Sequence, residues 1–292
     1  MNACMIGNPV GHSILPKIIK LISEKYNLDI NFISCMVESK DKLKDAIVGI
    51  KSLNFTAFDI THPYKKEIIQ YLDYLDPKAK AIGAVDTVVI KDGKLYGYNY
   101  NSTGAIKSIE EEGRKINPND KVVVIGAGGC SRAVCFEVYT RTKNLVIINR
   151  FLEEANDLKK DLVDLNGEGV KIYELNEQNL KKELVNANFI LHTTPVGMNP
   201  APNKTLIDKK IIDYLVKLKG TLNNVIFWDS IYSPSQTLFL KHAKEGGAKT
   251  INGLGMLKNE LPMLMEAYYG KKIDLDSISE EIDKLVLDNS KI

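Results

Sequence analysis

The segment KVVVIGAGGCSRAV, residues 121–134, constrains the fold of this chain more strongly than any other. A short run of β-forming residues leads directly into a glycine-rich turn, and a helical pattern begins immediately after it. This order is typical of βαβ units, whose strands lie parallel in a sheet that helices cover. The first turn of such a helix presents free N–H groups and the positive end of the helix dipole. The segment therefore predicts an α/β fold with an anion-binding turn.

The glycines of this turn suit a dinucleotide. Gly126 is placed for the tight turn, and Gly128 would let a pyrophosphate approach the backbone. Ser131 stands at the third glycine position of the usual G-x-G-x-x-G pattern, so the match is imperfect. A glycine-rich turn can also be purely structural, but its place between a strand and a helix favours nucleotide binding.

The end of the next expected strand bears on which nucleotide is bound. Sites for NAD usually place Asp or Glu there, to accept a hydrogen bond from the ribose 2′-hydroxyl. This chain has Asn149-Arg150 instead, and a cation favours the 2′-phosphate of NADP. Glu153 and Glu154 would repel that phosphate if they faced it. The alternative is an arginine exposed on a loop with no ligand.

Short apolar runs alternate with longer amphipathic runs along the whole chain, which favours βαβ units and parallel strands. Asp92-Gly93 lies between two strand-like runs and predicts a hairpin. Strands are expected at 3–7, 31–37, 55–60, 84–90, 94–98, 122–125, 145–148, 170–173, 189–192 and 225–228. Helices are expected at 15–26, 41–53, 65–72, 129–141, 152–165 and 277–287.

Composition limits the classes of function. A chain of 292 residues predicts two domains, and a net charge of +2 does not favour nucleic acid or an acidic membrane as a partner. No apolar run is long enough to span a membrane, and the N-terminus does not resemble a signal peptide. We therefore expect a cytoplasmic protein. The cysteines and histidines lack the clustered spacing of metal ligands, so no metal site and no disulfide framework is expected.

Lys65 is a candidate for acid–base chemistry. It follows Pro63 in ITHPYKK, between an expected strand and an expected helix. A lysine at a helix N-terminus faces the positive end of the dipole, and such a position suits a group that transfers protons. The alternative is a solvated surface lysine, which is far more common.

Several motifs together resemble the shikimate dehydrogenase family over nearly the whole chain, and they occur in the family's order. DITHPYK resembles the N-V-T-x-P-[FY]-K block, GYNYNSTG resembles G-x-N-T-D-x-x-G, and GAGGCSRA resembles G-A-G-G-A-[SA]-R-[AG]. The other matching segments are GNPVGHS at 7–13, GAVDTV at 83–88, NR at 149–150, TTPVGM at 193–198, DSIYSPSQT at 229–237 and NGLGML at 252–257.

The resemblance implies two α/β domains. Residues 1–101 with 253–292 would form the substrate-binding domain, and residues 102–252 a Rossmann-like NAD(P)-binding domain. The C-terminal helices would return to the first domain, and the substrate would lie between the domains. The implied reaction moves a hydride between NADP(H) and a ring carbon of shikimate or 3-dehydroshikimate, in aromatic amino-acid synthesis. A monomer or a homodimer is expected.

The resemblance also implies the site residues. Lys65 matches the family's catalytic lysine, and Asp86 and Asn101 take the positions on either side of it. The positions implied for the substrate are Ser13, Leu15, Thr61, Tyr232 and Glu260. Those implied for the cofactor are Gly126, Ala127, Gly128, Gly129, Cys130, Asn149, Arg150, Thr193 and Gly253.

This chain departs from the family at ligand-facing positions. Leu15 replaces the second serine of H-S-x-S-P, Tyr100 replaces Thr, and Glu260 replaces Gln. Asp86 stands at the family's Asn and Asn101 at its catalytic Asp, so a carboxylate and an amide are exchanged. Our hypothesis is that Asp86 supplies the missing carboxylate beside Lys65.

Three functions stay open at this point. The first is an NADP-dependent shikimate dehydrogenase. The second is a divergent paralogue acting on quinate, an amino-analogue or another cyclic polyol acid. The third is a non-catalytic sensor of nucleotide or ring acid, which the retained Lys65 disfavours. On the cofactor side, Phe151 replaces the family's Thr and Glu154 an Arg, so NAD or dual use is an alternative to NADP.

Overall fold

A computed structural model describes residues 1–11, 13–163, 169–270 and 272–289. The chain divides into two compact units. Unit 1 comprises Met1–Tyr100 and the C-terminal segment that begins at Glu260, and unit 2 comprises Asn101–Asn259. The second boundary falls inside helix α10, Leu254–Tyr269, seven residues beyond the expected position at 253. The motif NGLGML therefore belongs to unit 2.

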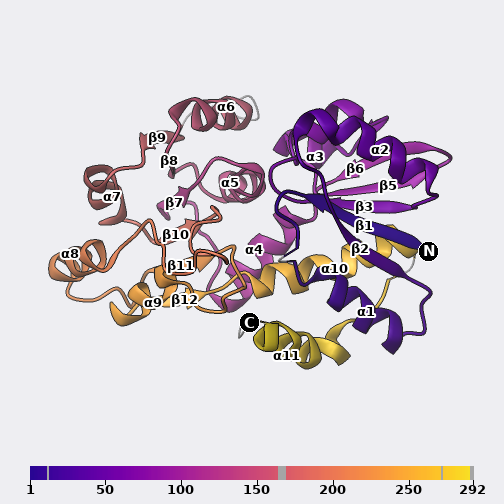
Figure 1. The fold of residues 1–292 in the computed structure, drawn as a ribbon. Coiled ribbons are helices and arrows are strands. Elements are labelled where there is room, and N and C mark those ends of the chain that lie inside the picture. The colour runs from indigo at the N-terminus through magenta and orange to yellow at the C-terminus, as the bar shows by residue number, and fades with distance from the viewer. Residues whose placement is uncertain (12, 164–168, 271, 290–292) are drawn as a thin grey trace. The chain divides into compact units, whose positions relative to one another are not determined.

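Within its described residues, unit 1 is built on a six-stranded mixed sheet with the order β2-β1-β3-β5-β6-β4 (Figure 1). β1 pairs in parallel with β2 and β3, whereas β5 runs antiparallel to both β3 and β6. The strands are β1 Asn2–Gly7, β2 Asn31–Met36, β3 Ala57–Ile60, β4 Tyr74–Leu75, β5 Thr87–Lys91 and β6 Lys94–Tyr98. The helices are α1 Leu15–Lys25, α2 Leu43–Ser52 and α3 Pro77–Ile82, with 3₁₀ segments at Lys40–Lys42 and Glu67–Tyr71.

The hairpin expected at Asp92-Gly93 is confirmed. Both residues have positive φ, 50° and 71°, which is the backbone of a two-residue turn whose twist matches that of the flanking strands. Helix α11, Ser279–Asn289, follows a 3₁₀ segment at Asp276–Ile278. Ile282 and Val286 are buried, so the tail packs by an apolar stripe within unit 1.

The described strands of unit 2 form a fully parallel six-stranded sheet with the order β12-β11-β10-β7-β8-β9. When the six strands are numbered along the chain and read from β9, the order is 3-2-1-4-5-6. This is the order of doubly wound dinucleotide-binding sheets. The strands are β7 Val122–Ile125, β8 Leu145–Asn149, β9 Lys171–Glu174, β10 Phe189–His192, β11 Ile226–Asp229 and β12 Lys249–Ile251. The helices are α4 Asn101–Glu112, α5 Gly129–Arg141, α6 Leu152–Val163, α7 Glu177–Leu184, α8 Lys209–Lys219 and α9 Leu238–Glu245.

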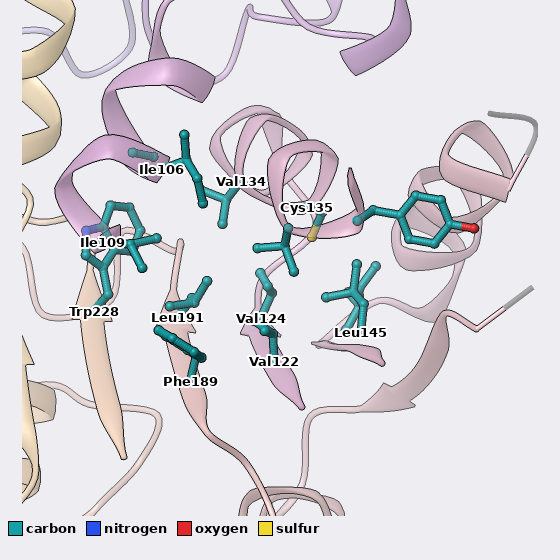
Figure 2. Close-up of a cluster of buried hydrophobic side chains, with 14 of the residues drawn as sticks. Ile106, Ile109, Val122, Val124, Val134, Cys135, Leu145, Phe189, Leu191 and Trp228 are labelled. Atoms are coloured by element: carbon teal, nitrogen blue, oxygen red, sulfur yellow. The ribbon is translucent and has the colours of Figure 1, made fainter. Parts of the chain in front are cut away.

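Each face of this sheet has its own core. Figure 2 shows one of them, in which Val122, Val124 and Leu191 meet side chains of α4 and α5 such as Ile109 and Val134. Alternate residues of the same strands, including Val123 and Ile190, join the second core against α7, α8 and α9. Strands that are apolar on both faces are what a sheet covered on both sides requires. The order of strands places the β7–β10 boundary at the point where such sheets bind ligands.

The helix expected at 65–72 is wrong in part. Residues 62–66 form turns, and the 3₁₀ segment Glu67–Tyr71 follows them. Lys65 therefore does not lie at the N-terminus of an α-helix, and the argument from the helix dipole does not apply to it. The sequence pattern also missed α3, whose first turn is capped by Asp76 through the N–H groups of Lys78 and Ala79.

No helix in the described ranges is both long and apolar enough to cross a bilayer. All four cysteines carry free thiols, and Cys4 and Cys135 are buried as small apolar residues.

Candidate functional site

Two motifs distant in sequence meet at the end of β1 in unit 1. The N–H of Asn8 donates to the carbonyl of His62 at 2.9 Å, and the N–H of Thr61 donates to the carbonyl of Ile6 at 2.9 Å. Position 7 must be glycine, because a Cβ there would lie 2.2 Å from the Thr61 methyl and 3.0 Å from the His62 oxygen. GNPVGHS and DITHPYK are thus held together by backbone contact. His12, within the first motif, lies outside the described residues.

Ser13 and Leu15 stand at the start of α1. The Ser13 hydroxyl accepts from the N–H of Leu15 at 3.3 Å, which orders the first turn of the helix. Leu15 is buried and belongs to the apolar face of α1. At this position the chain therefore has a packing residue where the family's second serine would offer a hydroxyl.

Backbone hydrogen bonds bring the Lys65 turn next to Asp86. The carbonyl of Lys65 accepts from the N–H of Val85 at 2.8 Å, and the carbonyl of Asp86 accepts from the N–H of Ile60 at 2.8 Å. Residues 60–65 and 85–86 therefore lie side by side between β3 and β5. Lys65 itself is half-buried.

Asp86 is buried and held from two sides. Its Oδ1 accepts from the N–H of Tyr100 at 3.0 Å and from the hydroxyl of Thr87 at 3.0 Å. Its own N–H donates to the carbonyl of Tyr98 at 3.0 Å. The residues at the end of β6 thus contact Asp86 through their backbone. The rings of Tyr98 and Tyr100 stack, with centroids 5.8 Å apart.

A second carboxylate, Asp59 on β3, lies beside Asp86. The Thr87 hydroxyl is also 3.2 Å from Asp59 Oδ1, and the Tyr268 hydroxyl of α10 donates to Asp59 Oδ2 at 2.7 Å. The pKa of Asp59 is raised to about 7, chiefly by burial. The charge of Asp86 acts in the same direction, while the hydrogen bonds from Tyr268 and Thr87 and the charge of Lys65 act against it. Unit 1 therefore holds two carboxylates and a lysine close together, in a setting typical of proton transfer.

The glycine turn of unit 2 has the geometry of a nucleotide cradle. Gly126 has φ +121°, and a Cβ there would lie 2.7 Å from Thr193 Oγ1. Gly128 is the N-cap residue of α5, so no side chain caps the start of this helix. A Cβ at this position would meet no atom within 4 Å. The start of α5 therefore borders open space at Gly128. Ala127 is buried beneath the turn, whereas Gly129 and Cys130 are half-buried.

Thr193 locks this turn in place. Its hydroxyl donates to the carbonyl of Ile125 at 2.8 Å and lies 2.7 Å from the hydroxyl of Ser131. Ser131, which breaks the glycine pattern, thus joins the start of α5 to the end of β10. The contact gives a physical reason for serine at the third glycine position.

The end of β8 carries the residues expected at the ribose. Arg150 is exposed, and its guanidinium lies over the ring of Phe151, 4.4 Å from the centroid. Asn149 donates to the carbonyl of Phe151 at 2.9 Å and to the Glu154 carboxylate at 3.0 Å. The Phe151 ring therefore supports the guanidinium of Arg150, and Glu154 is bound to Asn149.

A buried hydrogen-bond network, which the sequence analysis missed, lies at the ends of β10 and β11. His192 Nδ1 lies 3.0 Å from Asp229 Oδ1, and His192 Nε2 lies 2.6 Å from the Thr194 hydroxyl. The other Asp229 oxygen accepts from Thr237 at 2.6 Å. These contacts fix the TTPVGM and DSIYSPSQT segments at the ends of β10 and β11. Gly253 packs against the same loop, since a Cβ there would lie 2.1 Å from the Ser230 carbonyl oxygen.

The remaining expected site residues divide between the units. Thr61 and Glu260 belong to unit 1 with Lys65 and Asp86, and both are half-buried. Asn101, the first residue of α4, and Tyr232 belong to unit 2.

Comparison with known proteins fits these observations. Residues 5–88 match the family model described as the shikimate dehydrogenase substrate binding domain. A shikimate dehydrogenase (NADP⁺) from Methanococcus maripaludis is 39% identical over 99% of this chain and 96% of its own length. The chain belongs to the shikimate dehydrogenase family.

Solved structures of this family have the same fold. A crystal structure of a shikimate dehydrogenase in complex with NADP⁺ superposes with a TM-score of 0.85 at 33% identity, covering 98% of this chain and 94% of that one. A shikimate 5-dehydrogenase from Listeria monocytogenes in complex with shikimate and NAD gives 0.81 at 28% identity, with 96% of both chains covered.

Three residues of the unit 1 site were missed by the motif analysis: Asp59, Thr87 and Tyr268. The family block begins with Asn where this chain has Asp59, and that acid was a signal available in the sequence. Tyr268 gave no such signal, because it lies far along the chain in α10 and only the fold brings it to Asp59.

We predict unequal effects of alanine on stability at the two glycines of the nucleotide turn. Gly126→Ala should lower the free energy of unfolding by about 1–3 kcal/mol, because it forces a side chain into a positive-φ position against Thr193. Gly128→Ala should leave stability within about 0.5 kcal/mol, because its φ is ordinary and its Cβ meets open space. Denaturant unfolding of both variants measures this, and equal stability losses would contradict the geometry described here.

Proposed function

We propose that this protein is an NADP-dependent shikimate dehydrogenase, which interconverts shikimate and 3-dehydroshikimate in aromatic amino-acid synthesis. The observation that carries the proposal is Lys65 held by backbone bonds beside the buried carboxylate of Asp86. The sequence match to relatives of that name over almost the whole chain supports it. A cytoplasmic enzyme, monomeric or homodimeric, is part of the proposal.

We assign unit 2 to the cofactor. Its strand order, the uncapped start of α5 and the open space over Gly128 fit the pyrophosphate of a dinucleotide. Arg150, steadied on Phe151, is the proposed partner of the 2′-phosphate. Bound NADP would accept or supply the hydride.

We assign the acid–base chemistry to unit 1. Oxidation of an alcohol requires that its proton leave as the hydride leaves, and reduction requires the reverse. Lys65 is the proposed proton carrier, and Asp86 is proposed to orient its ammonium group. The buried position of Asp86 strengthens this electrostatic effect relative to water. Ser13 and Thr61 supply hydroxyls for a ring acid in the proposed site.

A second candidate is a paralogue that acts on quinate, an amino-analogue or another cyclic polyol acid. The specific observation that favours it is the acidity of unit 1, where Asp59, Asp86 and Glu260 are all carboxylic residues. An anionic substrate is disfavoured by added negative charge, and a substrate amine is favoured by it. Leu15 also removes one hydroxyl from the site proposed for the substrate carboxylate.

One assay separates these functions. The purified protein is mixed with NADP⁺ or NAD⁺ and with shikimate, quinate or an amino-analogue, and reduced nicotinamide is followed by absorbance. Turnover with shikimate at roughly 1–10³ s⁻¹ supports the first function. Turnover restricted to another acid selects the second. Nucleotide binding without turnover on any of them selects the sensor and overturns both.

The exchange of acid and amide predicts unequal roles for Asp86 and Asn101. Asp86→Asn should lower kcat roughly 10²-fold or more, because Lys65 loses its carboxylate partner while the amide oxygen still accepts from Tyr100. Asp92→Asn, in the hairpin turn where Asn adopts positive φ equally well, is the matched control and should leave kcat unchanged. An active Asp86→Asn enzyme would remove Asp86 from the mechanism.

Cofactor choice should depend on Arg150. Arg150→Ala should weaken NADP⁺ binding roughly tenfold, because one exposed charge-assisted hydrogen bond to phosphate is lost, and should leave NAD⁺ binding nearly unchanged. Phe151→Leu should produce a smaller loss in the same direction, since it removes only the ring beneath the guanidinium. Titration calorimetry with both nucleotides measures the difference. Equal weakening of both would show that Arg150 does not contact the 2′-phosphate.

A further inference from the structure

The Thr87 hydroxyl links the two buried carboxylates of unit 1, and its hydrogen bonds cannot be satisfied if both are ionised. Thr87 Oγ1 lies 3.2 Å from Asp59 Oδ1 and 3.0 Å from Asp86 Oδ1. A hydroxyl has a single hydrogen to donate. With two carboxylates, one of them would place an oxygen lone pair against the lone pairs of Thr87 at hydrogen-bond distance. The second carboxylate would also add a like charge beside the first in a buried position, which is costly.

A single additional proton removes this conflict. A protonated Asp59 donates from Oδ1 to Thr87 Oγ1, and Thr87 then donates to Asp86 Oδ1. Asp59 Oδ2 keeps its role as acceptor from the Tyr268 hydroxyl at 2.7 Å. Every hydrogen in the chain Tyr268–Asp59–Thr87–Asp86 then has an acceptor, and one negative charge remains, on Asp86.

The surroundings place the proton on Asp59 and not on Asp86. Asp86 Oδ1 accepts a backbone N–H, from Tyr100 at 3.0 Å, and a fixed amide dipole of this kind stabilises a carboxylate anion. Asp59 instead accepts from the side-chain hydroxyls of Tyr268 and Thr87, and both hydroxyls can rotate. Thr87 is also closer to Asp86 than to Asp59, as expected if it donates to Asp86.

We propose that Asp59 holds one proton shared with Asp86 through Thr87, and that Asp59 is thereby a positioning residue that keeps Asp86 ionised and oriented for catalysis. The catalytic part of this statement depends on the function proposed above, whereas the location of the proton does not. Asp59 touches neither substrate nor cofactor in this account and acts only through Thr87 and Asp86.

Titratable groups from several neighbouring elements lie close enough to Asp59 to influence its charge. They are Cys4 on β1, Lys65 on the turn after β3, Asp86 before β5 and Tyr268 on α10. Burial raises the pKa of the Cys4 thiol and of the Tyr268 hydroxyl, so both are neutral around pH 7. Lys65 and Asp86 carry the opposing charges, and the pKa of Asp59 lies at about 7 after burial has raised it from 3.8.

This assignment makes Asp59→Asn a test. The amide is the neutral counterpart of the protonated acid, because its oxygen accepts from Tyr268 and its NH₂ donates to Thr87. We expect Asp59→Asn to fold and to keep kcat at pH 7 within about threefold of the parent protein. Asp86→Asn, the same change on the other acid, should lose activity. The reverse pattern would place the proton on Asp86 and overturn the proposal.

The dependence of stability on pH provides a test that requires no substrate. The pKa of Asp59 is raised on folding, so the folded protein binds a proton that the unfolded chain has already released between about pH 4 and pH 7. Stability from this group is therefore complete below pH 4 and is lost as the pH rises to 7. Relative to Asp59→Asn, the folding equilibrium constant of the parent protein should fall by up to tenfold per pH unit across this window and then level off.

Two further results with Asp59→Asn would each overturn the proposed location of the proton. Identical pH dependence of unfolding for the parent protein and Asp59→Asn would show that Asp59 is ionised throughout, and would overturn the proposal. Failure of Asp59→Asn to fold would overturn it as well, since the amide replaces the neutral acid without loss of a hydrogen bond. Thr87→Val, compared with Thr87→Ser, tests the link itself: only the valine variant should lose activity.

The activity profile separates positioning from a purely structural role. As the pH rises above about 7, the parent protein should lose kcat relative to Asp59→Asn, because ionised Asp59 competes with Asp86 for the Thr87 hydrogen. A constant ratio of the two activities across this range would refute the positioning role. If no substrate is turned over at all, the proposed function fails while the unfolding test still decides where the proton lies.

Discussion

The pairing of β3 with β5 is the constraint on which the chemistry of unit 1 depends. The strands are antiparallel, and the ladder continues past β3 through the bonds from Ile60 to Asp86 and from Val85 to Lys65. Three groups separated by up to 27 positions in the sequence, Asp59, Lys65 and Asp86, are thereby fixed by backbone geometry alone. A shift of one residue in this register would turn Asp59 and Thr87 to opposite faces of the sheet and separate the linked acids.

A corresponding constraint in unit 2 is the order of its parallel strands. Because β10 lies beside β7, the carboxyl ends of both strands reach the same edge, and Thr193 meets the glycine turn there. The turn is then held by side chains that contact its backbone, and the space over Gly128 at the start of α5 stays open. Ser131 is part of this arrangement. It departs from the glycine motif and yet supplies the hydroxyl that joins α5 to β10.

The sequence predicted the parts of this protein whose signals are local. Apolar runs predicted the bounds of β7 and β10 correctly at both ends, and Asp92-Gly93 predicted the hairpin. Each of these signals resides within a few neighbouring residues. The helix expected at 65–72 failed because short amphipathic runs cannot distinguish an α-helix from turns followed by a 3₁₀ segment. Asp59 was overlooked for another reason: its importance arises from Thr87 and Tyr268, which approach it only in the folded chain. Family motifs located Asp86 and Lys65 but carried no information on how their hydrogens are arranged.

The proton on Asp59 bears on one departure of unit 1 from its family, the acid at position 59 where the family has Asn. Asp59 adds a further acid, and an ionised Asp59 would leave the site more negative by one unit. A neutral Asp59 removes that excess charge from the Asp59–Thr87–Asp86 network, in which Asp86 is then the single ionised carboxylate. Substrate preference should therefore depend on pH. As Asp59 ionises, the site gains the negative charge that disfavours an anionic ring acid, so substrate binding and the geometry of Asp86 should weaken together, through the same hydroxyl of Thr87.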